Sequence, residues 1–271
     1  MNDGMDWNAV RALMARDLRA VRRSKAVIIP MLAVPTLLLV VMPLMLGFVA
    51  RNASSDGVAR FLNSLPGHVA APITDLPQRE QLVVLVSGYL LAPLFLIVPL
   101  MVSAVLAADA FAGERERRTL ETVLHLPIRD RDLYVAKMLT AFVPAVVVAW
   151  VGFVLYALVA NAVAWPVMHR VFVPTALWLV MILWVTPAVA ALGLGVMVRV
   201  SARAQTVQGA NQLGGAVVLP LIFLALGQAS GLLLVDLPVA FGVGALVWLV
   251  AAVLTQRGAR RFTRNRLAPT I

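Results

Sequence analysis

Residues 109–137 read DAFAGERERRTLETVLHLPIRDRDLYVAK and form a charged island between two long apolar runs. This island carries six of the chain's thirteen acidic residues and six of its twenty-three basic residues. Glu114 and Arg118, and again Arg117 and Glu121, lie four residues apart, a spacing that favours opposite-charge pairs along a helix. Charge alone is typical of a solvated loop between membrane spans, but the order of the residues indicates more.

That order consists of two glutamates, a Thr-Leu-Glu triplet, a leucine, a proline that ends the predicted helix, and a lysine before the next apolar run. The positions are Glu114, Glu116, Thr119, Leu120, Glu121, Leu124, Pro127 and Lys137. The pattern resembles the cytoplasmic loop of the permease subunits of type 2 ABC transporters. Arg118 and Ala136 replace two glycines of the family pattern. Arg118 favours a firmer helix there, because glycine costs about 1 kcal/mol against better helix formers.

The resemblance implies that the island forms a coupling helix, which docks on a separate ATPase subunit. The residues expected to make this contact are Glu114, Glu116, Arg117, Thr119, Leu120 and Glu121. It also implies a pair of permeases, either two copies of this chain or this chain with a paralogue. Two ATPase subunits would bind ATP and Mg²⁺, and the implied direction of transport is export.

The composition places the chain in a membrane. Hydrophobic residues make up 61% of it, charged residues 13%, and the mean hydropathy is +0.90, whereas about a quarter of residues are charged in soluble domains. The absence of cysteine excludes disulfides and cysteine nucleophiles. The net charge of +10 lies beside the apolar runs, so we expect no nucleic-acid partner.

The sequence predicts an all-α polytopic membrane protein with six transmembrane helices, all within residues 26–256. Each apolar run is long enough to cross a hydrocarbon core of about 30 Å as a helix, the form that satisfies its own backbone in lipid. The predicted spans are 26–50, 81–108, 138–160, 172–198, 207–228 and 237–256. Residues 51–80 form a polar outer segment and 257–271 a basic tail. Residues 229–236 are either a short outer connection or a re-entrant turn.

The N-terminal segment, residues 1–25, is predicted to form an amphipathic helix on the inner membrane surface. Its apolar residues recur every three or four positions, and bases occupy the other faces, which suits anionic lipid. The apolar stripe is Trp7, Val10, Met14, Leu18 and Val21. The alternative is a disordered basic tail. A cleaved signal peptide is disfavoured because the run that follows is too long.

The distribution of bases predicts the orientation. Nineteen lie in the N-terminal segment, the island, the 199–206 loop and the tail, against four in the remaining loops. The positive-inside rule therefore places both termini and the island in the cytoplasm, with the chain in the cytoplasmic membrane.

The predicted spans contain no Asp, Glu, Lys, Arg or His, although such residues within a membrane usually mark proton relays or ion paths. No serine motif with a histidine partner supports catalysis, and the three histidines, His68, His125 and His169, lie apart in loops, so no metal site is predicted. A P-loop requires lysine after glycine, but Lys25 follows Ser24 and Lys137 follows Ala136. ATP hydrolysis is therefore expected in a partner.

Polar residues in spans two and five are candidates for the lining of a translocation path. These residues are Ser87, Tyr89, Ser103, Gln205, Gln208, Asn211 and Gln212. In the resembling family, spans two and five line the path between the paired subunits. The alternative is that these groups are hydrogen-bonding contacts between helices, worth about 0.6 kcal/mol each.

The sequence thus favours the permease subunit of an ATP-driven exporter for apolar or amphipathic small molecules, lipids or peptides. The resembling family also contains members assigned to sodium extrusion, so the resemblance does not narrow the cargo to one chemical class. One alternative is an ATP-independent secondary transporter or channel, which would more naturally carry charge inside the membrane. Another is a membrane enzyme acting on lipid, for which no catalytic constellation is present.

Overall fold

The computed structural model describes residues 5–52, 60, 76–84, 86–87, 91–113, 116, 128–201, 206–215, 219 and 237–261. Every regular element among these residues is helical, as predicted. The elements, with η for π-helical turns, are α1 (Trp7–Arg23), α2 (Lys25–Thr36), η1 (Leu37–Val41), α3 (Met42–Asn52), α6 (Gln78–Val83), α7 (Leu91–Phe95), α8 (Ile97–Ala108), η4 (Asp109–Gly113), α11 (Asp130–Met168), α12 (Ala176–Val180), η5 (Met181–Val185), α13 (Thr186–Ser201), α14 (Val207–Gly215) and α16 (Leu237–Arg261).

Within the described part of the chain, four helices are long and apolar enough to cross a membrane. They are Val27–Met45, Asp130–Met168, Ala176–Ser201 and Leu237–Arg260. These helices coincide with the first, third, fourth and sixth predicted spans. A shorter apolar helix, Ile97–Gly113, covers the later part of span two, and α14 begins span five. The count of six remains a prediction, because most of span five after Gly215 lies outside the described residues.

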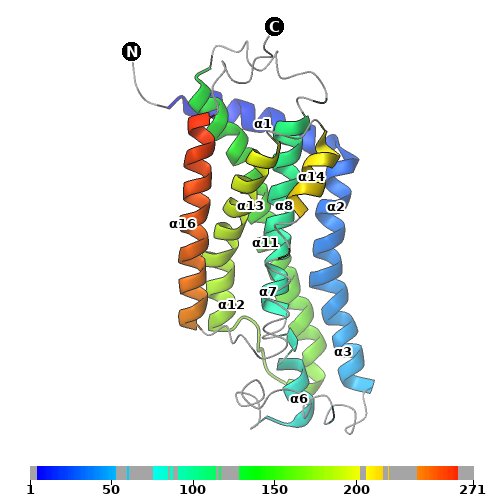
Figure 1. Ribbon diagram of the computed structural model, residues 1–271. Coiled ribbons are helices and arrows are strands. Elements are labelled where there is room, and N and C mark those ends of the chain that lie inside the picture. The colour runs from blue at the N-terminus through cyan, green and yellow to red at the C-terminus, as the bar shows by residue number, and fades with distance from the viewer. Residues whose placement is uncertain are drawn as a thin grey trace.

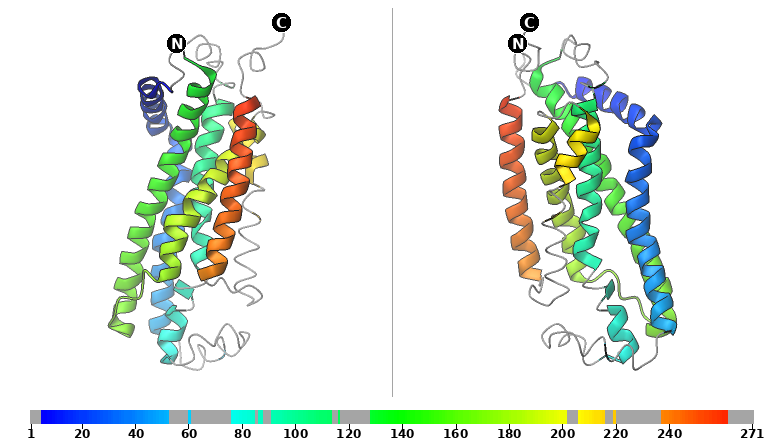
Figure 2. Two further views of the ribbon diagram at one scale, coloured as in Figure 1. Left: turned by 90° about the vertical axis from the view of Figure 1, so that its left-hand side faces the viewer. Right: turned by 45° about the vertical axis from the view of Figure 1, so that its right-hand side comes forward.

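The long helices run alongside one another as a bundle, and α1 lies across one end of it (Figures 1 and 2). The start of α11, the end of α8, α14 and the end of α16 meet at that same end, whereas α6 lies at the other (Figure 1). The first and last helices therefore begin and finish at the same end of the bundle, as an even number of spans predicts. We call this the α1 end.

Helix α11 is longer than the predicted third span. It starts at Asp130, inside the charged island, and its 39 residues correspond to about 58 Å at 1.5 Å per residue. Asp130 and Asp132 fall in its first turn, where acidic side chains favour a helix N-terminus. At the other end His169 adopts a left-handed conformation (φ 49°), and its N–H donates to the carbonyl of Trp165 at 2.9 Å.

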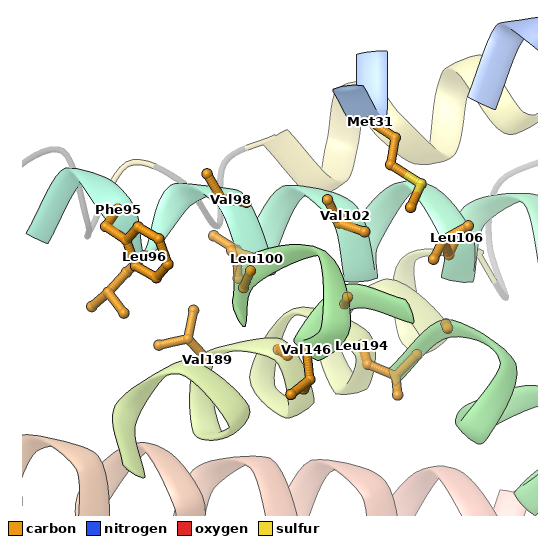
Figure 3. Packing of buried hydrophobic residues seen from close by; sticks show 14 of the residues in the cluster. Met31, Phe95, Leu96, Val98, Leu100, Val102, Leu106, Val146, Val189 and Leu194 are labelled. Atoms are coloured by element: carbon orange, nitrogen blue, oxygen red, sulfur yellow. The ribbon is translucent and has the colours of Figure 1, made fainter. Parts of the chain in front are cut away.

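Helix α8 forms the centre of the apolar core (Figure 3). Its buried side chains meet those of α2, α11 and α13; the labelled members include Met31, Val98, Leu100, Val102, Leu106, Val146, Val189 and Leu194. In lipid such helices associate through close van der Waals contact rather than through the release of water, and small residues allow that contact. Ala141, Ala145 and Ala149 form such a stripe along α11, each fully buried.

Helices α8 and α13 pack closely at Gly193. A Cβ atom there would lie 2.7 Å from Oγ of Ser103, 2.8 Å from Cδ1 of Leu100 and 3.1 Å from the carbonyl oxygen of Leu100. Because Cβ atoms essentially never lie within 3.0 Å of another heavy atom, a larger residue requires the Ser103 and Leu100 side chains to move. This contact fixes the spacing between the later part of span two and span four.

Candidate functional site

The predicted coupling residues belong almost entirely to a part of the chain outside the described residues: Glu114, Arg117, Thr119, Leu120 and Glu121. Glu116 is described, and it is exposed. Its Oε2 accepts a hydrogen bond from the backbone N–H of Val207 at 2.9 Å. Val207 is the first residue of α14, so the island is bonded directly to the start of the fifth predicted span.

The N-terminus of α14 has a second acceptor in Thr206. Its Oγ1 accepts from the N–H of Gly209 at 3.1 Å, and its carbonyl accepts the first intrahelical bond, from Ala210 at 3.0 Å. The N–H groups of a first helical turn lack intrahelical partners, and threonine is a preferred residue at this position. Sequence analysis missed Thr206, although a threonine directly before the helix is a signal that reveals such a cap.

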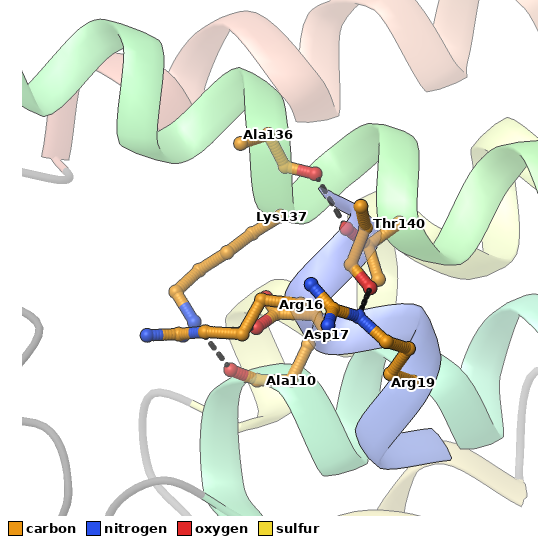
Figure 4. Close-up of polar contacts among 8 residues, drawn as sticks. Arg16, Asp17, Arg19, Ala110, Ala136, Lys137 and Thr140 are labelled. Carbon is orange, nitrogen blue, oxygen red and sulfur yellow. Dashed lines mark hydrogen bonds and ion pairs between the residues drawn. The ribbon is translucent and has the colours of Figure 1, made fainter. Parts of the chain in front are cut away.

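Lys137, the lysine of the family pattern, is buried on α11 with 2% of its surface exposed. Its Nζ donates to the carbonyl oxygen of Ala110 in η4 at 3.0 Å (Figure 4) and lies 5.7 Å from the centroid of the Phe111 ring. A buried ammonium requires such polar partners, because loss of water penalises its charge. Lys137 therefore joins the start of α11 to the π-helical turn that ends α8.

The start of α11 also holds α1. Val10 and Leu13 of α1 are buried against Leu133 and Ala136, and Oδ2 of the buried Asp132 accepts from the N–H of Asp6 at 3.4 Å. The helix predicted in 1–25 is present as Trp7–Arg23. Part of its apolar stripe packs on protein, which sequence periodicity cannot distinguish from packing on lipid.

Trp7, another member of that stripe, is 53% exposed. The bases Arg11, Arg16, Arg19, Arg22, Arg23 and Lys25 are also exposed. The placement of α1 on a membrane surface stays a prediction.

The candidate path residues fall into two groups. Ser87 and Ser103 are buried, and Oγ of Ser103 donates to the carbonyl of Leu100 at 2.9 Å. Gln208 and Gln212, one helical turn apart on α14, are exposed. Asn211 also belongs to α14, while Tyr89 and Gln205 lie outside the described residues. The two serines are therefore enclosed by their own bundle, whereas the two glutamines face outward from it.

Ser87 borders a small cavity between α3, α6 and the later part of α11. The cavity measures about 10 Å³, which is close to the space that a single water molecule needs. Nearby, the hydroxyl of Tyr156 donates to the carbonyl of Ser87 at 2.6 Å. Tyr156 belongs to a buried cluster of rings with Phe95, Phe153 and Trp178, whose centroids lie 5.0–6.4 Å apart. This region is packed and has no room for cargo.

At the end opposite α1, Asn161 holds the connection between α11 and α12. Its Nδ2 donates to the carbonyl of Val173 at 2.7 Å, and its Oδ1 accepts from the N–H groups of Phe172 and Val173 at 2.9 and 3.3 Å. Arg170 pairs with Glu80 at 3.0 Å. Sequence analysis missed Asn161, because it falls just after the predicted span and looked like a loop residue.

The described residues contain no candidate metal site, because no three His, Asp or Glu side chains lie together among them. His169 ends α11, and His68 and His125 lie outside the described residues. Asp109, Asp132 and Lys137, the buried acids and base in the described part of the chain, belong instead to η4 and to the start of α11.

A bundle of long apolar helices, with a charged segment and buried ionisable groups at one end, defines a polytopic helical membrane protein. The family model described as ABC-2 family transporter protein matches residues 11–239, and the chain belongs to this family. Its members are the membrane permeases of ABC transporters and work in general with an ABC ATPase. The resemblance noted in the island is thereby confirmed. No curated protein matches the chain.

Proposed function

We propose that this chain is the permease subunit of an ATP-driven exporter. Two permeases, either two copies or this chain with a paralogue, enclose the path, and two ATPase subunits dock on the island 109–137. The observation that carries the proposal is the bond between Glu116 and Val207. It joins the segment expected to dock on the ATPase to a helix of the expected path.

The energy comes from the partner subunits, which bind ATP and Mg²⁺. Closure of the two ATPase subunits on ATP moves the islands seated on them. Within each island, η4 ends at Gly113 and α11 begins at Asp130, so movement of the island tilts spans two, three and five. The path then opens alternately to the two sides of the membrane. This chain supplies the translocation path and transmits the movement of the ATPase subunits to it, and it performs no catalytic step.

The path lies between the two permeases, where the outward-facing Gln208 and Gln212 line it near the α1 end. A largely uncharged path suits apolar or amphipathic small molecules, lipids or peptides. The positive-inside rule places the α1 end in the cytoplasm. Membrane lipid contacts the basic face of α1, whose exposed arginines favour anionic headgroups.

The test is co-purification. The tagged chain is expressed with a candidate ATPase, solubilised and passed over a sizing column. We expect a stoichiometric complex whose ATP hydrolysis depends on lipid. Replacement of residues 114–121 by a Gly/Ser linker should abolish formation of this complex. The matched control replaces Arg257 and Arg260, two exposed bases near the C-terminus of α16, by alanine and should leave the complex intact.

The alternative function predicts the opposite result. A channel or secondary transporter would elute alone and would move solute into liposomes without ATP. The linker variant would then behave like the natural chain, and the island would be an ordinary connection.

A further inference from the structure

We propose that Glu116 is a positioning residue that acts inside the permease: its carboxylate holds the N-terminus of α14, and through this bond the movement of the island reaches span five. The inference rests on the proposed function and deepens it. In the family resemblance Glu116 is one of several residues that face the ATPase. The structure assigns its carboxylate a partner within its own chain instead.

The electrostatics of α14 favour this arrangement. The free N–H groups and aligned peptide dipoles at a helix N-terminus attract negative charge. Thr206 already provides a local acceptor, through its bond from Gly209, so α14 can begin without Glu116. Glu116 comes from 91 residues earlier in the chain. Its bond therefore contributes less to forming the helix than to joining two separate elements.

A second contact places the end of η4 against the same helix. Helix α14 packs against η4, and the absence of a side chain at Gly113 leaves room for Val207, because a Cβ atom at Gly113 would lie only 3.4 Å from Cγ2 of Val207 and 3.1 Å from Oδ1 of Asp109. Helix α14 also packs on α8 and α13, and Figure 1 shows it beside α8 near the α1 end. Glu116 follows Gly113 by three residues, so the end of span two and the carboxylate hold the first residue of α14 together.

The exposure of the bond suits a contact that moves. Glu116 is exposed, so water can replace its acceptor oxygen and the bond can break without leaving a buried group unpaired. Gln208 and Gln212 lie one and five residues beyond Val207 on the same helix. A shift of the α14 N-terminus therefore displaces both glutamines together.

The experiment removes each partner of the bond in turn. Glu116→Ala removes the acceptor. Val207→Pro removes the donor N–H at the first helical position, where proline is well tolerated, and the extended conformation that proline favours for Thr206 suits a residue that precedes a helix. Val207→Ala keeps the donor and shortens the side chain. Any loss of coupling in Val207→Ala measures the packing of the Val207 side chain, and only the further loss in Val207→Pro counts for the bond.

The readout is transport per ATP hydrolysed by the purified permease–ATPase complex in liposomes. We expect Glu116→Ala and Val207→Pro each to lower this ratio about fivefold or more, a typical size for coupling between sites. The double variant should be no worse than either single one, because both remove one interaction. If Val207→Pro couples normally while Glu116→Ala does not, or if the two losses multiply, Glu116 acts on another partner and the proposal is overturned.

A second measurement stands even if Val207→Pro fails to fold. The chain has no cysteine, so Gln212→Cys supplies a single label site on α14. With Glu116 in place, we expect trapped ATP to change the rate at which the thiol of Gln212→Cys reacts with a maleimide. The change should be smaller in Glu116→Gln, which keeps an acceptor oxygen. In Glu116→Ala, trapped ATP should leave the rate unchanged. An ATP-dependent change that persists in Glu116→Ala overturns the proposal.

Failure of the proposed function looks different from failure of this inference. If the unsubstituted chain forms no complex with an ATPase or transports without ATP, the permease assignment itself falls. If that complex forms and couples, but none of the substitutions at 116 and 207 alters coupling, the assignment stands and the role of Glu116 is overturned.

Discussion

Nζ of Lys137 lies 3.0 Å from the carbonyl oxygen of Ala110, so a buried ammonium on α11 is bonded to the backbone of a π-helical turn at the end of α8. The two residues lie near opposite ends of the island, 27 positions apart. Whatever moves the island must therefore move α8 and α11 together at this point, or break the bond.

This bond predicts that Lys137→Met destabilises the chain by about 1–3 kcal/mol, because the Ala110 carbonyl loses a buried donor. The apolar length of the side chain is largely kept, so a void is not the cause. The measurement is the thermal unfolding midpoint of the detergent-solubilised protein. Lys25→Met is the matched control: Lys25 is the only other lysine and is exposed, and it should leave the midpoint near its original value.

The contact between α8 and α13 predicts that Gly193→Ala is destabilising, although alanine favours helices by about 1 kcal/mol over glycine. The new methyl group would meet Ser103 and the Leu100 backbone, and overpacking of this kind costs about 1–3 kcal/mol. Gly242→Ala is the control, because a Cβ atom on Gly242 meets nothing within 4 Å. The same unfolding assay should show Gly242→Ala neutral or stabilising. Equal behaviour of the two variants would contradict the close approach.

The Asn161 network predicts that Asn161→Leu loosens the connection after α11. The N–H groups of Phe172 and Val173 lose their acceptor, while the side chain keeps its branched shape and its number of heavy atoms. Arg170 in this connection is exposed and provides a trypsin site. Limited digestion of the solubilised protein should cut after Arg170 several times faster in the variant. Cleavage after Arg257 at the other end of the bundle serves as the internal reference and should keep its rate.

The orientation predicts an accessibility pattern in whole cells. Val171, 67% exposed, belongs to the end opposite α1 and should face outward, whereas Asn8 on α1 should face the cytoplasm. Since the natural chain has no cysteine, Val171→Cys and Asn8→Cys each carry one thiol. A membrane-impermeant maleimide should label the first in intact cells and the second only after permeabilisation. The reverse pattern would show that the positive-inside rule fails here.

The features that the sequence predicts best are those that follow from the local periodicity of apolar residues. Four of the predicted spans and the amphipathic helix α1 are present because an apolar run or stripe fixes the helix and its buried face, independently of what it meets. The predicted span 138–160 lies inside α11, which begins eight residues before it, at Asp130, because a helix can start in the charged segment that precedes a membrane span. Asp132 and Lys137 are accommodated inside α11 by the N–H of Asp6 and the carbonyl of Ala110.

The contacts that define the candidate site were beyond sequence analysis. The pairing of Glu116 with Val207 depends on how α14 packs beside α8, and no local pattern encodes a bond across 91 residues. Likewise, Ser87 and Ser103 are polar residues of a span, yet each is buried by packing: Ser87 lies beside α3, α6 and α11, and Ser103 lies where α8 meets α13. Polar residues in a span indicate that a partner exists, while the fold decides which partner it is.

The length of α11 has a mechanical consequence. One continuous helix runs from Asp132 and Lys137, which hold α1 and η4, to Asn161, which holds the connection at the opposite end. Ala141, Ala145 and Ala149, all fully buried, lie between these two ends of the helix, so a rigid tilt about this stretch would move the two ends in opposite directions. At about 58 Å in length, a rotation of about 5° swings each tip by about 2.5 Å, in opposite directions.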